Sequence, residues 1–153
     1  MFFWEVVEGD EVCPITLQAG SRRFLASGAQ PVADIDALAT RSERQIAVLA
    51  WNYHDDDLPG PTAEVRLSVA GIPANGPVLI EHYRIDETHS NSYTVWKQMG
   101  SPAKPTAEQY ARMEAAGQLQ SLRSPEWVVV KQGAVVLPFS LPRHAVSLVR
   151  IEW

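Results

Sequence analysis

The sequence has very little cysteine, no basic tract and no long apolar run. Cys13 is the single cysteine among 153 residues, so neither an intrachain disulfide nor a cysteine-based metal cluster is possible. Thirteen basic and 18 acidic side chains give a formal net charge of −5, and the Lys and Arg residues do not cluster. Because nucleic-acid phosphates require such a cluster, no nucleic-acid partner is expected.

Targeting and membrane signals are also missing. Residues 1–4 are apolar, but four acidic residues follow by position 11, without a basic stretch or a long apolar core. This start is unlike a signal peptide, so a cytoplasmic location is the default expectation. No run of about 18 apolar residues occurs, so no membrane-spanning helix is expected.

The sequence contains enough apolar residues for one core. Hydrophobic residues make up 46% and charged residues 20%, which is typical of neither a disordered nor a membrane-embedded chain. A (β/α)8 barrel usually takes about 250 residues and does not fit. We therefore expect one domain over residues 25–153, preceded by an irregular leader at residues 1–24 that could add one strand.

From residue 25 onward, short stretches rich in β-branched and aromatic residues alternate with turns. This pattern predicts strands at 32–38, 45–53, 64–70, 78–86, 127–131, 134–139 and 145–153. Both alternating sets are apolar in 45–53, which predicts a central strand covered on both faces. Gln132-Gly133 predicts a tight hairpin turn, because Gly adopts the positive φ that a two-residue loop demands.

Two predicted helices, at residues 89–99 and 106–119, interrupt this β pattern. Thr106 and Gln109 have the spacing of a capping box, and Gly117 is expected to end the second helix. The predicted fold is therefore mainly β, an antiparallel β-sandwich of about 7–8 strands with a two-helix insertion at about residues 89–119. A sandwich does not need such an insertion for its own core, so lids and docking elements are the usual roles.

A cluster of His54 and three aspartates at 55–57 is the one candidate for metal binding. Carboxylate oxygens are the ligands that Ca²⁺ prefers. However, the cluster follows a predicted strand and precedes Pro-Gly-Pro at 59–61, which favours a solvated turn. Asp55 and Asp57 are weak metal candidates, and no cofactor is expected.

Three tryptophans are candidates for stacking against sugar rings: Trp51, Trp96 and Trp127. Aromatic faces perform this role in carbohydrate-binding sandwiches. Trp51 and Trp127 fall in predicted strands between aliphatic residues, which favours a place in the core. Trp96 lies on the first predicted helix.

Four motifs occur in a fixed order: Trp-x-Tyr-His at 51–54, Tyr-Arg-Ile-Asp at 83–86, Trp-x-x-Met-Gly-Ser-Pro at 96–102 and Pro-Thr-x-x-Gln at 105–109. With these motifs and the segment 141–153, the sequence resembles the C-terminal region of glycoside hydrolase family 39 over about residues 25–153. Members of this family include bacterial β-xylosidases and, more distantly, α-L-iduronidase.

The resemblance implies a non-catalytic role. In that family, two glutamates of a (β/α)8 barrel perform the retaining chemistry, and the β-sandwich after the barrel is an accessory domain. The acid/base of the family normally sits in an Asn-Glu dipeptide, but the three asparagines here precede Tyr53, Gly76 and Ser92. The resemblance therefore implies no catalytic residue in this chain, which would pack against a barrel that the chain lacks.

The same resemblance suggests a set of barrel-docking or cleft-edge residues. The candidates are His82, Tyr83, Arg84, Asp86, His89 and Trp96. A purely internal hydrogen-bonding role is the alternative. Asp86 and Glu87 are not expected to form a catalytic pair, because neighbouring loop carboxylates usually are solvated or cap helices, whereas retaining hydrolysis needs a separation of about 5–5.5 Å across a cleft.

Two further expectations concern self-association and an alternative function. Without the barrel, the barrel-facing surface should drive self-association into a homo-oligomer. The alternative function is a free-standing carbohydrate-binding module for xylan-type sugars.

Overall fold

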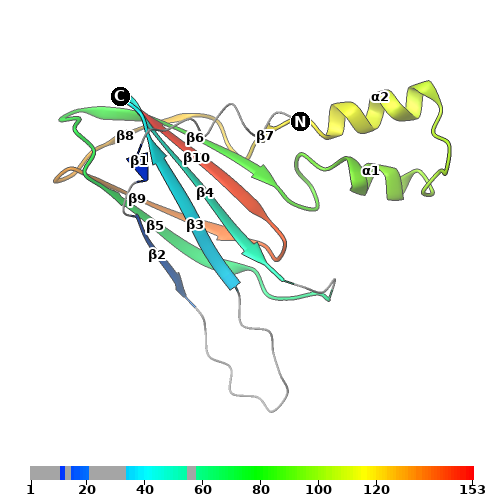
Figure 1. The fold of residues 1–153 in the computed structure, drawn as a ribbon, viewed down its shortest axis with the longest axis horizontal. Helices are drawn as coiled ribbons and strands as arrows, with labels where there is room; N and C mark the ends of the chain where they lie inside the picture. The colour runs from blue at the N-terminus through cyan, green and yellow to red at the C-terminus, as the bar shows by residue number, and fades with distance from the viewer. Residues whose placement is uncertain (1–10, 13–14, 21–33, 55–57) are drawn as a thin grey trace, which may run out of the picture.

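The structure is a computed structural model that describes residues 11–12, 15–20, 34–54 and 58–153. The strands are β1 (Glu11–Val12), β2 (Ile15–Gly20), β3 (Asp34–Arg41), β4 (Gln45–Tyr53), β5 (Ala63–Ala70), β6 (Pro77–Ile85), β7 (Gln120–Ser121), β8 (Glu126–Val129), β9 (Ala134–Leu141) and β10 (Val146–Glu152). The helices are α1 (Ser92–Gln98) and α2 (Ala107–Ala116). Eight strands are longer than two residues, and they confirm the predicted mainly β fold with a two-helix insertion (Figure 1).

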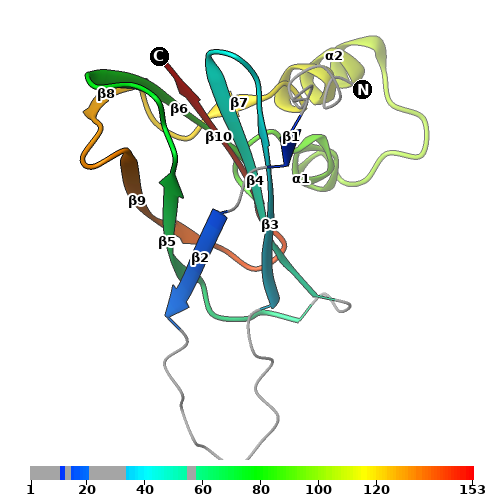
Figure 2. The same ribbon diagram turned by 60° about the vertical axis from the view of Figure 1, so that its left-hand side comes forward.

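The strands form two antiparallel sheets that face each other (Figure 2). Sheet A has the order β1-β3-β4-β10-β6-β7, and β8 also pairs with β6. Sheet B has the order β2-β5-β9. The last strand in the sequence, β10, lies between β4 and β6, with Val149 opposite both Val48 and His82.

The core lies between the two sheets, and strict alternation along the strands builds it. In β5, Val65, Leu67 and Val69 are buried, whereas Glu64 and Arg66 point to solvent. This is the pattern of a strand with one dry and one wet face. The half-buried strand predicted at 64–70 is therefore confirmed.

Strand β4 has the predicted bounds and the predicted central position, between β3 and β10. Its residues Ile46 and Val48 are buried in the core. On the opposite side, which we call the outer face of sheet A, Trp51 is half-buried and Tyr53 is 57% exposed. No other layer of the described residues packs there, so the prediction that both faces of this strand are covered is wrong for the described part of the chain (Figure 2).

The tight turn predicted at Gln132-Gly133 is confirmed, with φ angles of 54° and 72°. A bridge between Lys131 and Ala134 closes it. The strands that flank the turn belong to different sheets, because β8 pairs with β6 and β9 pairs with β5. The turn therefore carries the chain from sheet A to sheet B.

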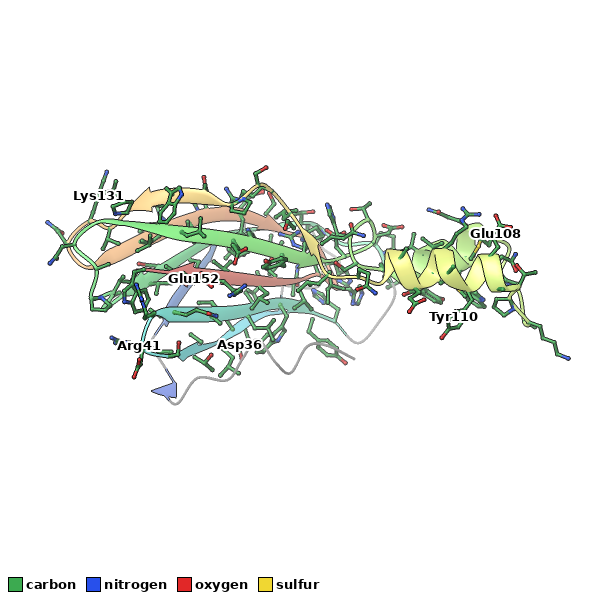
Figure 3. All side chains as sticks on the ribbon, turned by 90° about the horizontal axis from the view of Figure 1, so that it is seen from above. Asp36, Arg41, Glu108, Tyr110, Lys131 and Glu152 are labelled. Carbon is green, nitrogen blue, oxygen red and sulfur yellow. The ribbon has the colours of Figure 1, made fainter. Side chains whose placement is uncertain are left out.

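The two helices lie side by side and project from one end of the sandwich (Figure 3). We call residues 92–116 the arm. Thr106 and Gln109 form the predicted capping box, and Gly117 is the C-cap of α2. Neither helix contains a fully buried residue, so the arm has no core of its own. Among the described residues, no helix is long and apolar enough to cross a membrane.

Candidate functional site

The loop that joins β6 to the arm contains most of the candidate residues from the sequence. Strand alternation places His82 and Arg84 on the same side of β6 as the core residues Val78 and Ile80. They are 2% and 3% exposed, respectively. Two polar side chains are thus buried at the end of the core that lies nearest the arm.

Arg84 links both sheets to this loop. Its Nε donates a hydrogen bond to Ser147 Oγ in β10 at 3.0 Å, and its Nη2 donates to the carbonyl of Ser140 in β9 at 2.8 Å. Its Nη1 lies 3.5 Å from Asp86 Oδ2. Burial lowers the pKa of Arg84, and the Asp86 carboxylate opposes that shift.

Asp86 holds the turn that follows β6. Its Oδ1 accepts hydrogen bonds from the backbone N–H groups of Thr88 at 2.8 Å and His89 at 2.9 Å, and it lies 3.0 Å from His89 Nδ1. Burial alone would raise the pKa of Asp86, but these hydrogen bonds outweigh it and lower that pKa. Asp86 is therefore a carboxylate engaged by its own loop, not an open acid or base.

Ser90 and Asn91 fasten both ends of the insertion. Ser90 Oγ donates to the carbonyl of Arg84 at 2.7 Å and accepts from the N–H of Gln120 at 2.8 Å. Asn91 Nδ2 donates to the carbonyl of Asp86 at 2.9 Å, and its Oδ1 accepts from the N–H of Thr94 to cap α1. We call Arg84, Asp86, Ser90 and Asn91 the mount of the arm.

His82 and Ser147 form an imidazole–hydroxyl pair, with 3.0 Å between Nε2 and Oγ. Arg123 Nη2 lies 3.5 Å from His82 Nδ1 and can only donate, so Nδ1 accepts and Nε2 carries the proton. His82 therefore cannot take a proton from Ser147, which is itself fully buried. Burial, together with Arg84 and Arg123, lowers the pKa of His82 to about 3. The pair is a neutral structural contact, not a nucleophile and its base.

The remaining docking candidates lie elsewhere. Tyr83 points to the outer face of sheet A, where its hydroxyl donates to Glu81 Oε1 at 3.0 Å, and burial raises the pKa of Tyr83. Trp96 Nε1 donates to the carbonyl of Pro102 at 3.1 Å, and its ring stacks on Tyr93 with 5.5 Å between centroids. The structure thus unites His82, Arg84, Asp86 and His89, and it separates Tyr83 and Trp96 from them.

The interpretation of Trp127 as a core residue is wrong, since its side chain is 68% exposed. In β8 the neighbouring Val128 packs against the core, so alternation turns Trp127 to the outer face at the edge of sheet A. Trp51 also lies on the outer face and is half-buried, outside the core cluster.

The metal candidates Asp55 and Asp57 lie outside the described residues. Among those that are described, no group of three His, Cys, Asp or Glu residues could hold a metal ion.

The outer face of sheet A has an apolar centre. Leu38, Leu49, Leu148 and Tyr83 stand opposite one another across β3, β4, β10 and β6. Leu38 is 42% exposed, whereas Leu148 is only 3% exposed.

Charged side chains border this apolar row. Arg150 lies next to it along β10 and forms an ion pair with Glu81 at 2.9 Å and another with Glu152. An apolar centre with a charged border is typical of protein-binding surfaces.

Comparison with known proteins identifies the family. The family model of Glycosyl hydrolases family 39 matches residues 19–125. The chain belongs to glycosyl hydrolase family 39. A β-xylosidase of Caldicellulosiruptor saccharolyticus is 30% identical over 118 residues, which are 77% of this chain and 24% of that protein. The α-L-iduronidase of Mus musculus is 29% identical over 87 residues, which are 52% of this chain and 14% of that protein.

Solved structures share the fold. The crystal structure of the family 39 enzyme from Xanthomonas axonopodis pv. citri superposes with a TM-score of 0.64 at 18% identity. The match covers 76% of this chain and 25% of that enzyme. The chain thus spans about a quarter of the length of the bacterial family members that it matches. Its relatives are glycoside hydrolases, and this chain corresponds to a small part of them.

Proposed function

We propose that this chain is a non-catalytic accessory domain that packs the outer face of sheet A against a (β/α)8 catalytic barrel. One observation carries the proposal: an apolar row crosses four strands of this face, and no layer of the described residues covers it. Leu38 and Tyr53 remain 42% and 57% exposed there. Full burial of a large apolar side chain contributes about 1.5–3 kcal/mol, so burial of these two side chains would favour docking, and the entropy lost on association would offset part of that gain.

In this proposal the arm projects beside the active-site cleft of the barrel. The arm extends beyond the end of the sandwich, and the mount fixes its direction (Figure 3). His82, Arg84 and Asp86 then do not contact the barrel, and their hydrogen bonds inside the domain position the mount. Tyr83 on the outer face and Trp96 on the arm are the candidates for direct contact.

A chimera tests the docking. Residues 11–153 of this chain, which include β1 and β2, would replace the matching region of the Caldicellulosiruptor saccharolyticus β-xylosidase. We expect a folded chimera that hydrolyses an aryl xyloside and loses activity and thermal stability with Leu38→Asp and Leu49→Asp. Arg66→Asp, on the solvent side of β5, is the matched control. If Leu38→Asp and Leu49→Asp had the same activity and melting temperature as the Arg66→Asp control, docking through this face would be refuted.

The isolated chain offers a second test. Pure protein should not release chromophore from a chromogenic xyloside above the blank, and measurable turnover would overturn the non-catalytic assignment. Without a barrel, the chain should self-associate through the same face in analytical ultracentrifugation. Leu38→Asp should restore the monomer, and a monomeric parent chain would count against an adhesive outer face.

A further inference from the structure

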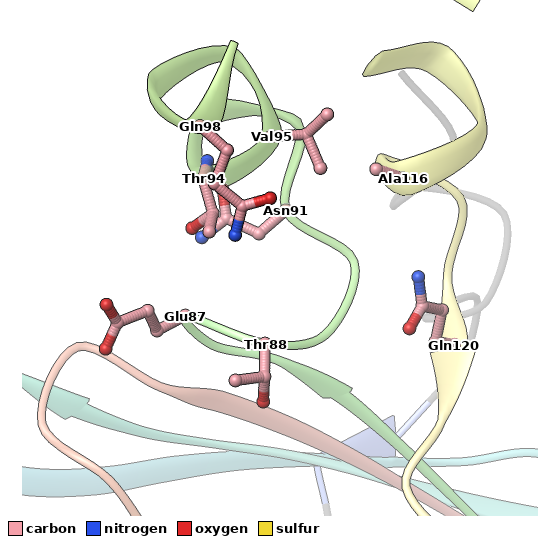
Figure 4. A pocket seen from close by; sticks show the side chains of 8 residues that line it. All are labelled: Glu87, Thr88, Asn91, Thr94, Val95, Gln98, Ala116 and Gln120. Atoms are coloured by element: carbon pink, nitrogen blue, oxygen red, sulfur yellow. Dashed lines mark hydrogen bonds between the residues drawn. The ribbon is translucent and has the colours of Figure 1, made fainter. Parts of the chain in front are cut away.

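A hollow of about 370 Å³ lies at the base of the arm, between α1, the end of α2 and the loop after β6 (Figure 4). This volume is within the range of small-ligand pockets, about 300–1,000 Å³. Its polar lining residues are Glu87, Thr88, Asn91, Thr94, Gln98 and Gln120. Figure 4 shows Thr94 and Gln98 on α1 above the loop residues Glu87 and Thr88, with Gln120 on another side.

Two of these side chains stabilise the loop that lines the hollow. Asn91 caps α1 and donates to the carbonyl of Asp86, as described above. Thr88 Oγ1 donates to Asp86 Oδ1 at 2.9 Å. These bonds fix the loop before any ligand arrives, and a preorganised wall reduces the entropy lost on binding.

The other four polar side chains are available to bind a ligand. Within the described part of the chain, the side chains of Glu87, Thr94, Gln98 and Gln120 make no hydrogen bond or ion pair. Together they offer a carboxylate acceptor, a hydroxyl and two amides, so donors and acceptors are mixed. This set complements a ligand with several hydroxyl groups, because each hydroxyl both donates and accepts.

The charge of the hollow narrows the ligand class. Glu87 is its one ionisable lining residue, and no Lys, Arg or His lines it. An anionic ligand would face this carboxylate without a counter-charge, at an energetic cost. A neutral polyhydroxyl ligand would meet no such cost.

We propose that this hollow binds one unit of a neutral sugar through Glu87, Thr94, Gln98 and Gln120. Val95 and Ala116 are its apolar lining residues. No aromatic ring lines the hollow, so the binding relies on hydrogen bonds and is weak, with a dissociation constant in the millimolar range. The site is separate from the outer face of sheet A and does not depend on docking to a barrel.

The test is an NMR titration of the ¹⁵N-labelled 153-residue chain with xylobiose. We expect saturable shifts of the amides of residues 87–98 and of Gln120. Thr94→Val and Gln98→Ala should each weaken binding about tenfold, the effect of one lost hydrogen bond of roughly 1.4 kcal/mol. Tyr93→Ala is the matched control on α1, because Tyr93 does not line the hollow and packs under Lys97, 4.7 Å from its ring.

Glucuronic acid tests the charge argument. It should bind more weakly than the neutral sugar, and Glu87→Gln should narrow that difference. Linear, non-saturating shifts up to the solubility limit of xylobiose would overturn the proposal, as would wild-type affinity in Thr94→Val. Saturable shifts centred on Trp127 instead would assign sugar binding to a different surface. None of these outcomes bears on docking, which the chimera tests separately.

Discussion

The sandwich and the arm are held by different forces. The sandwich buries a continuous cluster of aliphatic side chains from both sheets, whereas no residue of α1 or α2 is buried. Helix caps and the polar mount hold the arm instead. A core substitution should therefore unfold the domain, and a mount substitution should release the arm while the sandwich persists.

The largest effect is expected from the core. Leu67→Ala removes a fully buried side chain at the centre of sheet B. The lost burial and the cavity should reduce the free energy of unfolding by about 3 kcal/mol, measured by urea denaturation. Val129→Ala, at a side chain that is 61% exposed, is the control and should cost much less. Similar costs for both variants would contradict the assigned core.

The mount comes next. Asp86→Asn leaves the 3%-exposed guanidinium of Arg84 without its counter-charge and should cost about 2 kcal/mol. The loss should be local: hydrogen exchange should accelerate in residues 88–98 and remain slow in β4 and β10. Glu87→Gln is the matched control, because this neighbouring carboxylate bonds to no other described residue. Uniformly faster exchange throughout the sandwich would show that the arm and the sandwich are not separable.

Acid should weaken the sandwich through its buried histidine. The pKa of His82 falls from 6.5 to about 3 on folding, so the unfolded state binds the extra proton between these values. The free energy of unfolding is therefore unaffected by His82 above pH 6.5. As the pH falls below 6.5, proton uptake by the unfolded state lowers this free energy by about 1 kcal/mol per pH unit. Urea denaturation at several pH values above about 4 should show this slope. This range avoids pH values below 3.8, where protonation of Asp86 would lower the stability further.

His82→Gln should flatten the slope, since the amide does not titrate in this range. His144→Gln, at an exposed position, is the control and should retain the slope. An unchanged pH profile in His82→Gln would place the acid sensitivity elsewhere.

The smallest effect is expected at the far end of the arm. Thr106→Ala removes the side chain that accepts from the N–H of Gln109 and should destabilise α2 by about 1 kcal/mol. Because no residue of α2 is fully buried, the urea midpoint of the sandwich should not move. Helicity from circular dichroism should decrease, and Thr106→Ser should retain it. A lowered urea midpoint would mean that the helix contributes to the core.

Local signals in the sequence predicted the regular elements well. The bounds of β4 follow from its dense apolar pattern, and the capping box at Thr106 follows from two residues three positions apart. The burial of His82 and Arg84 could also have been anticipated, because alternation places them in line with Val78 and Ile80. Their hydrogen-bond partner, Ser147, lies more than 60 positions away and could not.

The sequence could not predict which strands pair or which strands lie at a sheet edge, because these features also depend on residues far apart in the chain. The Gln132-Gly133 turn has hairpin geometry, but long-range pairing sends its two strands to different sheets. Trp127 has aliphatic neighbours like a core residue, and only its position at a sheet edge exposes it. The hollow beneath the arm also depends on three segments that meet only after folding.

The place of β10 has a consequence for biosynthesis. A ribosome delivers this strand after all the others described here, yet it fills the gap between β4 and β6. Until it emerges, both neighbours present open edges that could capture strands of other nascent chains. Sheet A can therefore close only after the ribosome has made all the other described strands, and slow decoding of the segment before β10 would lengthen the period in which these edges need chaperones.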